Sequence, residues 1–328
     1  MNQLPELPEL PELPELPELP ELPERDLPPG RHRLLKERLM TEIRQEHETR
    51  PERRPSTTRG PWLRPALVAG AVAVVSAIAF TLSLPSGGQE RSDPAASQKV
   101  EALWEDIALA AEHADVPADI RDDQFVYVRS KVGWTTQDGD GPAKLEPIHQ
   151  REVWLSVDGT EEGMLYDADA GHHDEPLEKE TPGIPSNTSY RHLQTLPTDP
   201  DKMFEWLNSV SEGSSSKDEA NFVLVGDLTR ESLMPPAQAA ALYRAAAKIS
   251  GVFVIDDAVD AAGRHGVAVA RVDDGERVEL IFDKKTKEYL GEREVAAEDL
   301  GWGFDKGDVT GRTAVLERAV VDKKGERP

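Results

Sequence analysis

The run from Ala66 to Leu84 holds nineteen residues without a single charge. An α-helix rises about 1.5 Å per residue, so a helix of this length spans roughly the 30 Å hydrocarbon core of a bilayer. A secretory signal begins near the first residue and has a shorter apolar run, whereas a buried soluble helix keeps one polar face. The run therefore predicts one transmembrane helix over residues 66–84, with the lipid bilayer as its partner.

Basic residues are concentrated on the N-terminal side of this run. Five arginines precede it, whereas Arg91 alone follows closely; the five are Arg50, Arg53, Arg54, Arg59 and Arg64. The positive-inside rule then places the N-terminus in the cytoplasm and the C-terminal domain outside. The sequence thus predicts a single-pass protein of the cell membrane.

The N-terminal segment repeats Leu-Pro-Glu seven times between Leu4 and Glu24. Proline at every third position removes a backbone donor and fixes φ, so neither helix nor sheet forms, and a polyproline II rod fits the period. Such a rod is either a low-complexity spacer or a docking element. We therefore expect a disordered tail over 1–30, an amphipathic cytoplasmic helix over 31–48, a juxtamembrane linker over 49–65, a second linker over 85–97 and a folded domain over 98–328.

The segment 31–48 carries a narrow apolar stripe. Leu35, Leu39 and Ile43 are spaced four residues apart, Met40 lies beside them, and most of the rest is charged. An isolated helix of this length is marginal in water, so it needs a membrane surface or a partner groove to persist. Its mixed charges favour a groove on a partner protein over a membrane surface. Leu35, Leu39, Met40 and Ile43 are the predicted partner contacts.

Charge and cysteine content exclude several classes of function. Of the formal net charge of −24, residues 85–328 carry −22. An acidic domain disfavours nucleic acid and anionic headgroups and allows cationic partners. The chain has no cysteine, which excludes disulfides, thiol catalysis and thiolate metal sites.

Periodicity predicts an α+β domain, with helices on one side of a mostly antiparallel sheet. The expected helices are 99–115, 200–210, 218–233 and 236–250, although Phe222–Val225 could also form a strand. A long loop or lid is expected over 168–188. The expected strands are 125–134, 152–158, 163–167, 190–196, 252–255, 267–272, 277–282, 289–295 and 313–321.

No motif in the chain indicates a reaction. His172-His173-Asp174-Glu175 is the most ligand-like cluster, but adjacent histidines in a loop point in different directions, which favours a solvated loop. Hydrolase, metalloprotease, phosphate-loop and dinucleotide fingerprints are absent, so we expect no enzyme, no cofactor and no metal. Five tryptophans serve either packing or an apolar cleft: Trp104, Trp134, Trp154, Trp206 and Trp302.

Four stretches are similar to a known pattern. They are Leu196–Pro200 with Phe204–Leu207, Pro235-Pro236 with Ala241–Ala245, Asp260–Arg264, and Leu290–Arg293. Together they resemble an actinobacterial family of single-pass membrane proteins of unknown function, commonly encoded beside extracytoplasmic-function sigma factors. The resemblance implies an anti-sigma-like topology, and the lack of cysteine departs from the zinc-bearing type.

Two functional hypotheses follow. The first is a regulatory protein, whose cytoplasmic helix binds a partner such as a sigma factor and whose outer domain senses a signal. The alternative is a membrane-anchored carrier or binding module for an apolar ligand. The carrier needs an open apolar cleft between sheet and helices, which separates the two hypotheses.

Replacing Leu35 and Leu39 with Asp tests the apolar stripe. Burying an unpaired charge costs several kcal/mol, whereas the whole binding free energy of a micromolar contact is roughly 8 kcal/mol. The affinity for a sigma factor should therefore fall by more than about a hundredfold. The measurement compares the 1–64 segment and its double variant for binding to the neighbouring sigma factor. A wild-type segment that does not bind would leave the regulatory hypothesis without its sequence-level support.

Overall fold

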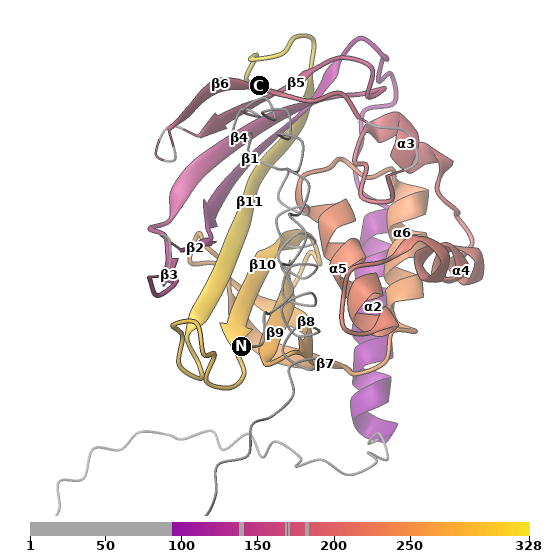
Figure 1. Ribbon diagram of the computed structural model, residues 1–328. Helices are drawn as coiled ribbons and strands as arrows, with labels where there is room; N and C mark the ends of the chain where they lie inside the picture. The colour runs from indigo at the N-terminus through magenta and orange to yellow at the C-terminus, as the bar shows by residue number, and fades with distance from the viewer. Residues whose placement is uncertain (1–93, 138–140, 168, 170, 181–183) are drawn as a thin grey trace, which may run out of the picture.

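The computed structural model describes residues 94–137, 141–167, 169, 171–180 and 184–328. Within these ranges nine strands form one antiparallel sheet in the order β6-β5-β4-β1-β11-β10-β9-β8-β7 (Figure 1). They are β1 (Phe125–Gly133), β4 (His149–Ser156), β5 (Gly163–Asp167), β6 (His172–Leu177), β7 (Val252–Val259), β8 (His265–Asp273), β9 (Glu276–Asp283), β10 (Tyr289–Ala296) and β11 (Val309–Val321). A separate short ladder joins β2 (Thr135–Thr136) to β3 (Lys144–Leu145).

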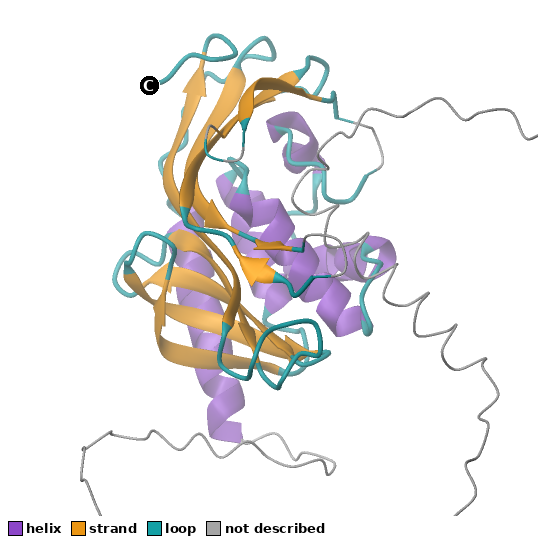
Figure 2. Ribbon diagram, turned by 60° about the vertical axis from the view of Figure 1, so that its left-hand side comes forward, coloured by secondary structure: helices purple, strands orange, loops and turns teal. Residues whose placement is uncertain are grey.

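The helices of the described residues lie together on one face of the sheet, and the strands curve around them (Figures 1 and 2). The opposite face, which we call the open face, carries small apolar clusters of its own. The five helices are α2 (Pro94–Glu112), α3 (Tyr190–Thr195), α4 (Pro200–Val210), α5 (Lys217–Arg230) and α6 (Pro236–Ala246).

The fold class predicted from the sequence is corrected by this architecture. That prediction combined a disordered tail and an outer α+β domain with one transmembrane helix. None of the five described helices is both long and apolar enough to cross a bilayer. The run 66–84 lies outside the described residues, as do the predicted tail, amphipathic helix and linker before it. The cell-membrane localisation derived from that run stays a prediction.

The core between helices and sheet is built around stacked aromatic rings. Trp104 of α2 lies 5.8 Å from the Tyr243 ring of α6 and 5.9 Å from the Phe282 ring of β9, measured between ring centroids. Trp104 and Phe282 have no exposed surface. Aromatic side chains bury large apolar areas and pack in offset or edge-on pairs. This filled centre is not the open apolar cleft that the carrier hypothesis requires.

Local capping explains two of the helices. The Asp199 carboxylate accepts a hydrogen bond from the backbone N–H of Lys202 at 3.0 Å, and Pro200 follows it, so α4 begins where the sequence predicts. Ser216 caps α5 in the same way, accepting from the N–H of Glu219 at 3.1 Å. The stretch that could have been strand or helix is therefore helix, as favoured, and α5 is buried on most of its sides.

A predicted strand and a predicted loop are wrong, and the linker expected over 85–97 overlaps α2, which begins at Pro94. Residues 190–196 were expected as a strand but form α3, with Tyr190 and Leu193 buried three positions apart on one face. The loop expected over 168–188 contains β6, which pairs with β5. This strand lies at the edge of the sheet and is largely polar and exposed, so no apolar alternation marks it. An edge position also tolerates its Pro176.

Strand β11 joins the two halves of the sheet, but its two ladders differ in length. It pairs with β1 from Phe125↔Val321 to Gly133↔Arg312, and with β10 only from Arg293↔Arg312 to Val295↔Val309. Beyond the Arg293↔Arg312 pair, hydrogen bonds from a side chain connect β10 and β11 in place of a backbone ladder.

The replacement comes from the turn between β7 and β8. The Arg264 guanidinium donates to the carbonyl of Leu290 at 3.0 Å and to that of Val315 at 2.8 Å, so it bridges β10 and β11. The buried Asp260 carboxylate holds it, accepting from Arg264 Nε at 2.6 Å. The turn that contains Asp260 and Arg264 thus links β10 and β11 where their ladder ends.

Gly291→Ala tests how closely the backbones approach at this junction. A Cβ at position 291 would lie 2.3 Å from the Thr313 carbonyl oxygen, an overlap with backbone that no side-chain movement relieves. We expect a loss of about 1–3 kcal/mol of unfolding free energy in urea denaturation, as for other overpacked sites. Gly301→Ala is the matched control, because nothing lies within 4 Å of its added Cβ. Equal stability of the two variants would contradict the close approach.

Candidate functional site

The residues predicted from the sequence as partner contacts are Leu35, Leu39, Met40 and Ile43, and all four lie outside the described residues. Their role stays a prediction. The His172-His173-Asp174-Glu175 cluster is not a loop but the start of β6. His172 is hydrogen-bonded to Glu175, and the His173 ring lies edge-on to Tyr166. Each histidine is thus engaged by a different neighbour, so the pair does not converge on one point.

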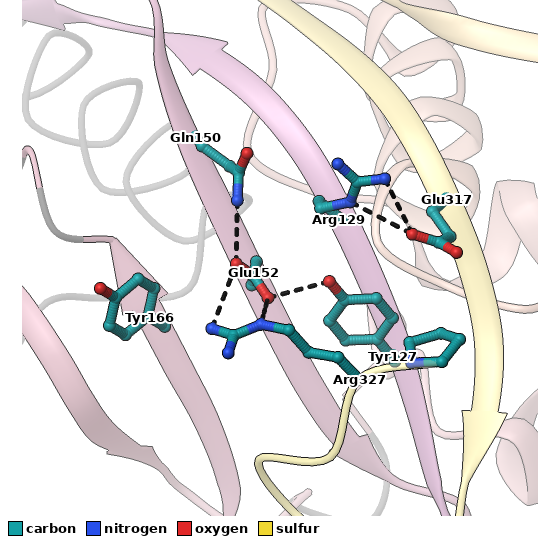
Figure 3. A pocket seen from close by; sticks show the side chains of 8 residues that line it. Tyr127, Arg129, Gln150, Glu152, Tyr166, Glu317 and Arg327 are labelled. Atoms are coloured by element: carbon teal, nitrogen blue, oxygen red, sulfur yellow. Dashed lines mark hydrogen bonds and ion pairs between the residues drawn. The ribbon is translucent and has the colours of Figure 1, made fainter.

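A hollow of about 460 Å³ lies on the open face of the sheet (Figure 3). Its walls combine phenol rings with paired acids and bases from β1, β4, β5, β11 and the segment that follows β11. Lining residues are Tyr127, Arg129, Gln150, Glu152, Tyr166, Glu317, Arg327 and Pro328.

Strand alternation places these side chains together. In β1 the valines at 126 and 128 belong to the helix-side core, so Tyr127 and Arg129 point to the open face. In β4 Val153 faces the core, and its neighbours Glu152 and Trp154 face the other way. Register then sets Arg129 opposite Glu152 and, on the other side, opposite Glu317.

Glu152 is the centre of the site. Its carboxylate accepts from the Tyr127 hydroxyl at 2.8 Å and from Gln150 Nε2 at 2.9 Å. It also accepts from Arg327 Nε at 2.6 Å. The Glu152 side chain is only 3% exposed, so three donors compensate a carboxylate that is almost completely removed from water.

These contacts fix the protonation states. Burial alone would raise the pKa of Glu152, but the hydrogen bonds from Arg327, Tyr127 and Gln150 outweigh it and hold the pKa below its usual value. Burial, together with the hydrogen bond to Glu152, raises the pKa of the Tyr127 hydroxyl to about 12. The carboxylate is therefore charged and the phenol is a donor near neutral pH. That combination suits recognition of a cation better than proton transfer.

Residues 322–328 form a short structure that we call the hook. The Glu326 carboxylate accepts from the backbone N–H groups of Asp322 and Lys323 at 3.0 and 3.1 Å, which closes a turn. The Glu326 carbonyl accepts from Trp154 Nε1 at 2.5 Å. Asp322 anchors the start of the hook through Arg121 at 2.9 Å. The hook thereby lays Arg327 over Glu152 and the neighbouring rings.

A second pair of charges lies at the rim of the hollow. Arg129 donates to Glu317 Oε2 from Nε at 3.2 Å and from the terminal nitrogen at 2.9 Å, across the β1–β11 ladder. Both side chains are a little over one-third exposed. Such a pair contributes little to stability because water screens it, so its side chains are free to meet a ligand.

A buried charge cluster between α5 and β10 is enclosed by the fold. Arg230 of α5 donates to Glu292 of β10 at 2.7 Å, and its guanidinium lies over the Trp134 ring. Burial alone would lower the pKa of Arg230, but the negative charges of Glu292 and Asp227 outweigh burial and raise the pKa above its usual value. Both partners are under one-tenth exposed. This cluster fastens α5 to the sheet and is closed to a ligand.

No model of a known protein family matches the chain, and no characterised protein matches its sequence. The resemblance to an anti-sigma-like family therefore stays a prediction.

Sequence reasoning missed most of this site. Tyr127, Glu152 and Arg327 were not singled out, although Trp154 was among the tryptophans assigned to packing or a cleft. The signal that could have revealed the site is the alternation in β1 and β4, where polar and aromatic residues occupy the positions between the core-facing valines. Arg327 had no local signal, because it lies 175 positions from Glu152 along the chain.

Glu152→Gln is expected to destabilise the protein in a pH-dependent way. The folded-state pKa is lowered, so the charge stabilises the fold above the ordinary pKa of 4.5 and this stabilisation is lost as pH falls through the folded value. The variant should lose about 1–3 kcal/mol at neutral pH, and the difference from wild type should shrink in acid. Urea denaturation across pH measures it, with exposed Glu162→Gln as control. A difference that grows in acid would contradict the assignment.

Proposed function

We propose that this chain is a regulatory protein that recognises a charged ligand through its 94–328 domain and binds a partner protein, most simply a sigma factor, through residues 31–48. The observation that supports it is the hollow on the open face. The Glu152 carboxylate in this hollow is buried, ionised and hydrogen-bonded to three donors. Two aromatic rings and the half-buried Arg129–Glu317 ion pair lie beside it.

The chemistry of the hollow favours binding over catalysis. Its acid has a lowered pKa and its phenol a raised one, whereas a general acid or base works best with a pKa near the operating pH. Serine and histidine are absent from its lining, so the nucleophile and base of a hydrolase are not assembled at this place.

The carrier alternative has weaker support. The centre of the sheet–helix interface is filled by Trp104, Tyr243 and Phe282, and the hollow of the open face is rich in charge. A carrier of an apolar ligand would bind a fluorescent apolar probe saturably when folded, and this binding would be lost when the protein is unfolded. In our proposal the folded protein does not bind such a probe.

Substitutions in the hollow should change the regulatory output. Arg129→Ala and Tyr166→Ala remove a charge and a ring from its lining without touching the helix-side core. In cells that express the full chain with an extracytoplasmic-function sigma factor that binds residues 31–48, transcription from that factor's promoter should change by about fivefold or more, the lower range of coupling between sites.

The control for this experiment is Lys284→Ala, which removes an exposed ion pair with Asp257 from the other half of the sheet. It should leave transcription unchanged. Unchanged transcription in both hollow variants, at equal protein levels, would overturn the proposal.

A further inference from the structure

Arg327 lies in the hollow as a bound cation would. Its guanidinium meets both oxygens of Glu152, from Nε at 2.6 Å and from a terminal nitrogen at 3.3 Å. Figure 3 shows the contact of Arg327 with Glu152 and the Tyr166 ring nearby. The Cζ atom of Arg327 lies 5.5 Å from the centroid of the Tyr166 ring and 5.7 Å from that of the Trp154 ring. A two-point carboxylate contact together with two aromatic rings is the combination that recognises a guanidinium group.

The receiving side of this contact is held in place by bonds that do not involve Arg327. Tyr127 and Gln150 both donate to the Glu152 carboxylate. The Tyr127 and Trp154 rings pack with their centroids 5.1 Å apart. A site whose groups are fixed in advance loses little conformational freedom when it binds, so the pocket is preorganised whether or not Arg327 is in it.

The occupant, by contrast, is largely exposed to solvent. The Arg327 side chain is 55% exposed, whereas that of Glu152 is 3% exposed. The hook has its own anchors at Asp322 and at the Glu326 carbonyl, apart from the Arg327 side chain. The guanidinium can therefore leave the hollow by a local movement while the β11 ladder stays paired.

From this asymmetry we propose, building on the function proposed above, that the hollow is a binding site for the arginine side chain of a peptide or protein ligand, and that Arg327 is a built-in competitor for it. The hollow extends beyond the guanidinium to the Arg129–Glu317 pair. A ligand larger than one side chain thus finds polar contacts at the rim.

The competitor sets a threshold for the ligand. A group on a short tether has an effective concentration in the millimolar range, so a weak external ligand displaces Arg327 only when it is abundant or carries further contacts. Arginine is favoured over lysine, because the planar guanidinium matches a carboxylate at two points and stacks on rings.

The test uses full-length protein with 15N-labelled tryptophan indoles and the probe N-acetyl-arginine amide. The Trp154 indole N–H reports directly on the hook, since it donates to the Glu326 carbonyl, and Trp154→Phe assigns its signal. Arg327→Ala should bind the probe about tenfold more tightly than wild type, from the loss of the tethered competitor. Lys324→Ala, an exposed change within the hook, should bind like wild type.

Two further variants identify the site. In the Arg327→Ala background, Glu152→Gln should abolish binding, and Tyr166→Ala should weaken it by about fivefold through loss of one cation–π contact. N-acetyl-lysine amide should bind more weakly than the arginine probe. The buried Trp104 indole signal shows that each variant is folded.

Three results would overturn the inference: no saturable shift in Arg327→Ala, equal binding of the arginine and lysine probes, or binding that is unaffected by both Glu152→Gln and Tyr166→Ala. If the probe fails while hollow variants still alter transcription, the ligand class is wrong and the regulatory proposal stands. Probe binding by Arg327→Ala without any transcriptional effect supports the site and refutes the regulatory role.

Discussion

The hydrogen bonds of Arg264 hold together two strands that cannot complete their own ladder. Every residue of β1 is paired with β11, whereas the ladder between β10 and β11 ends at Arg293↔Arg312 although their backbones stay close. Two carbonyls would otherwise lack partners inside the sheet, and unpaired backbone groups there are costly. A guanidinium from a neighbouring turn satisfies both.

Local signals allowed much of the fold to be predicted from the sequence. The apolar spacing of α2 and the cap at Asp199 each depend on neighbours within a few residues, and each is found. The failures have physical causes as well. The α3 segment is too short for its period to be distinguished, and β6 is a polar edge strand with no buried face to mark it. The transmembrane helix in the predicted fold class has no counterpart among the described helices.

The site was harder to predict than the fold, because its parts are far apart in sequence. Glu152 and Tyr127 look like ordinary outward-facing strand residues until register sets their strands side by side. Arg327 reaches them only because β11 is adjacent to β1 and the hook turns back. The strong acidity of residues 85–328 was the one global hint, since a negative field attracts cations over a distance before short-range contacts select among them.

The pairing of β1 with β11 also bears on how the chain reaches its native state. The ladder joins Phe125 to Val321 and Gly133 to Arg312, so the centre of the sheet forms between segments at opposite ends of the domain. Loop closure over such a separation is slow, and topologies rich in distant pairs fold slowly. During synthesis, β1 and β4 therefore wait with an unpaired edge while the helices and the β7–β10 meander emerge. An exposed edge of this kind invites pairing with other chains, which makes the interval before β11 leaves the ribosome the period of greatest risk of aggregation.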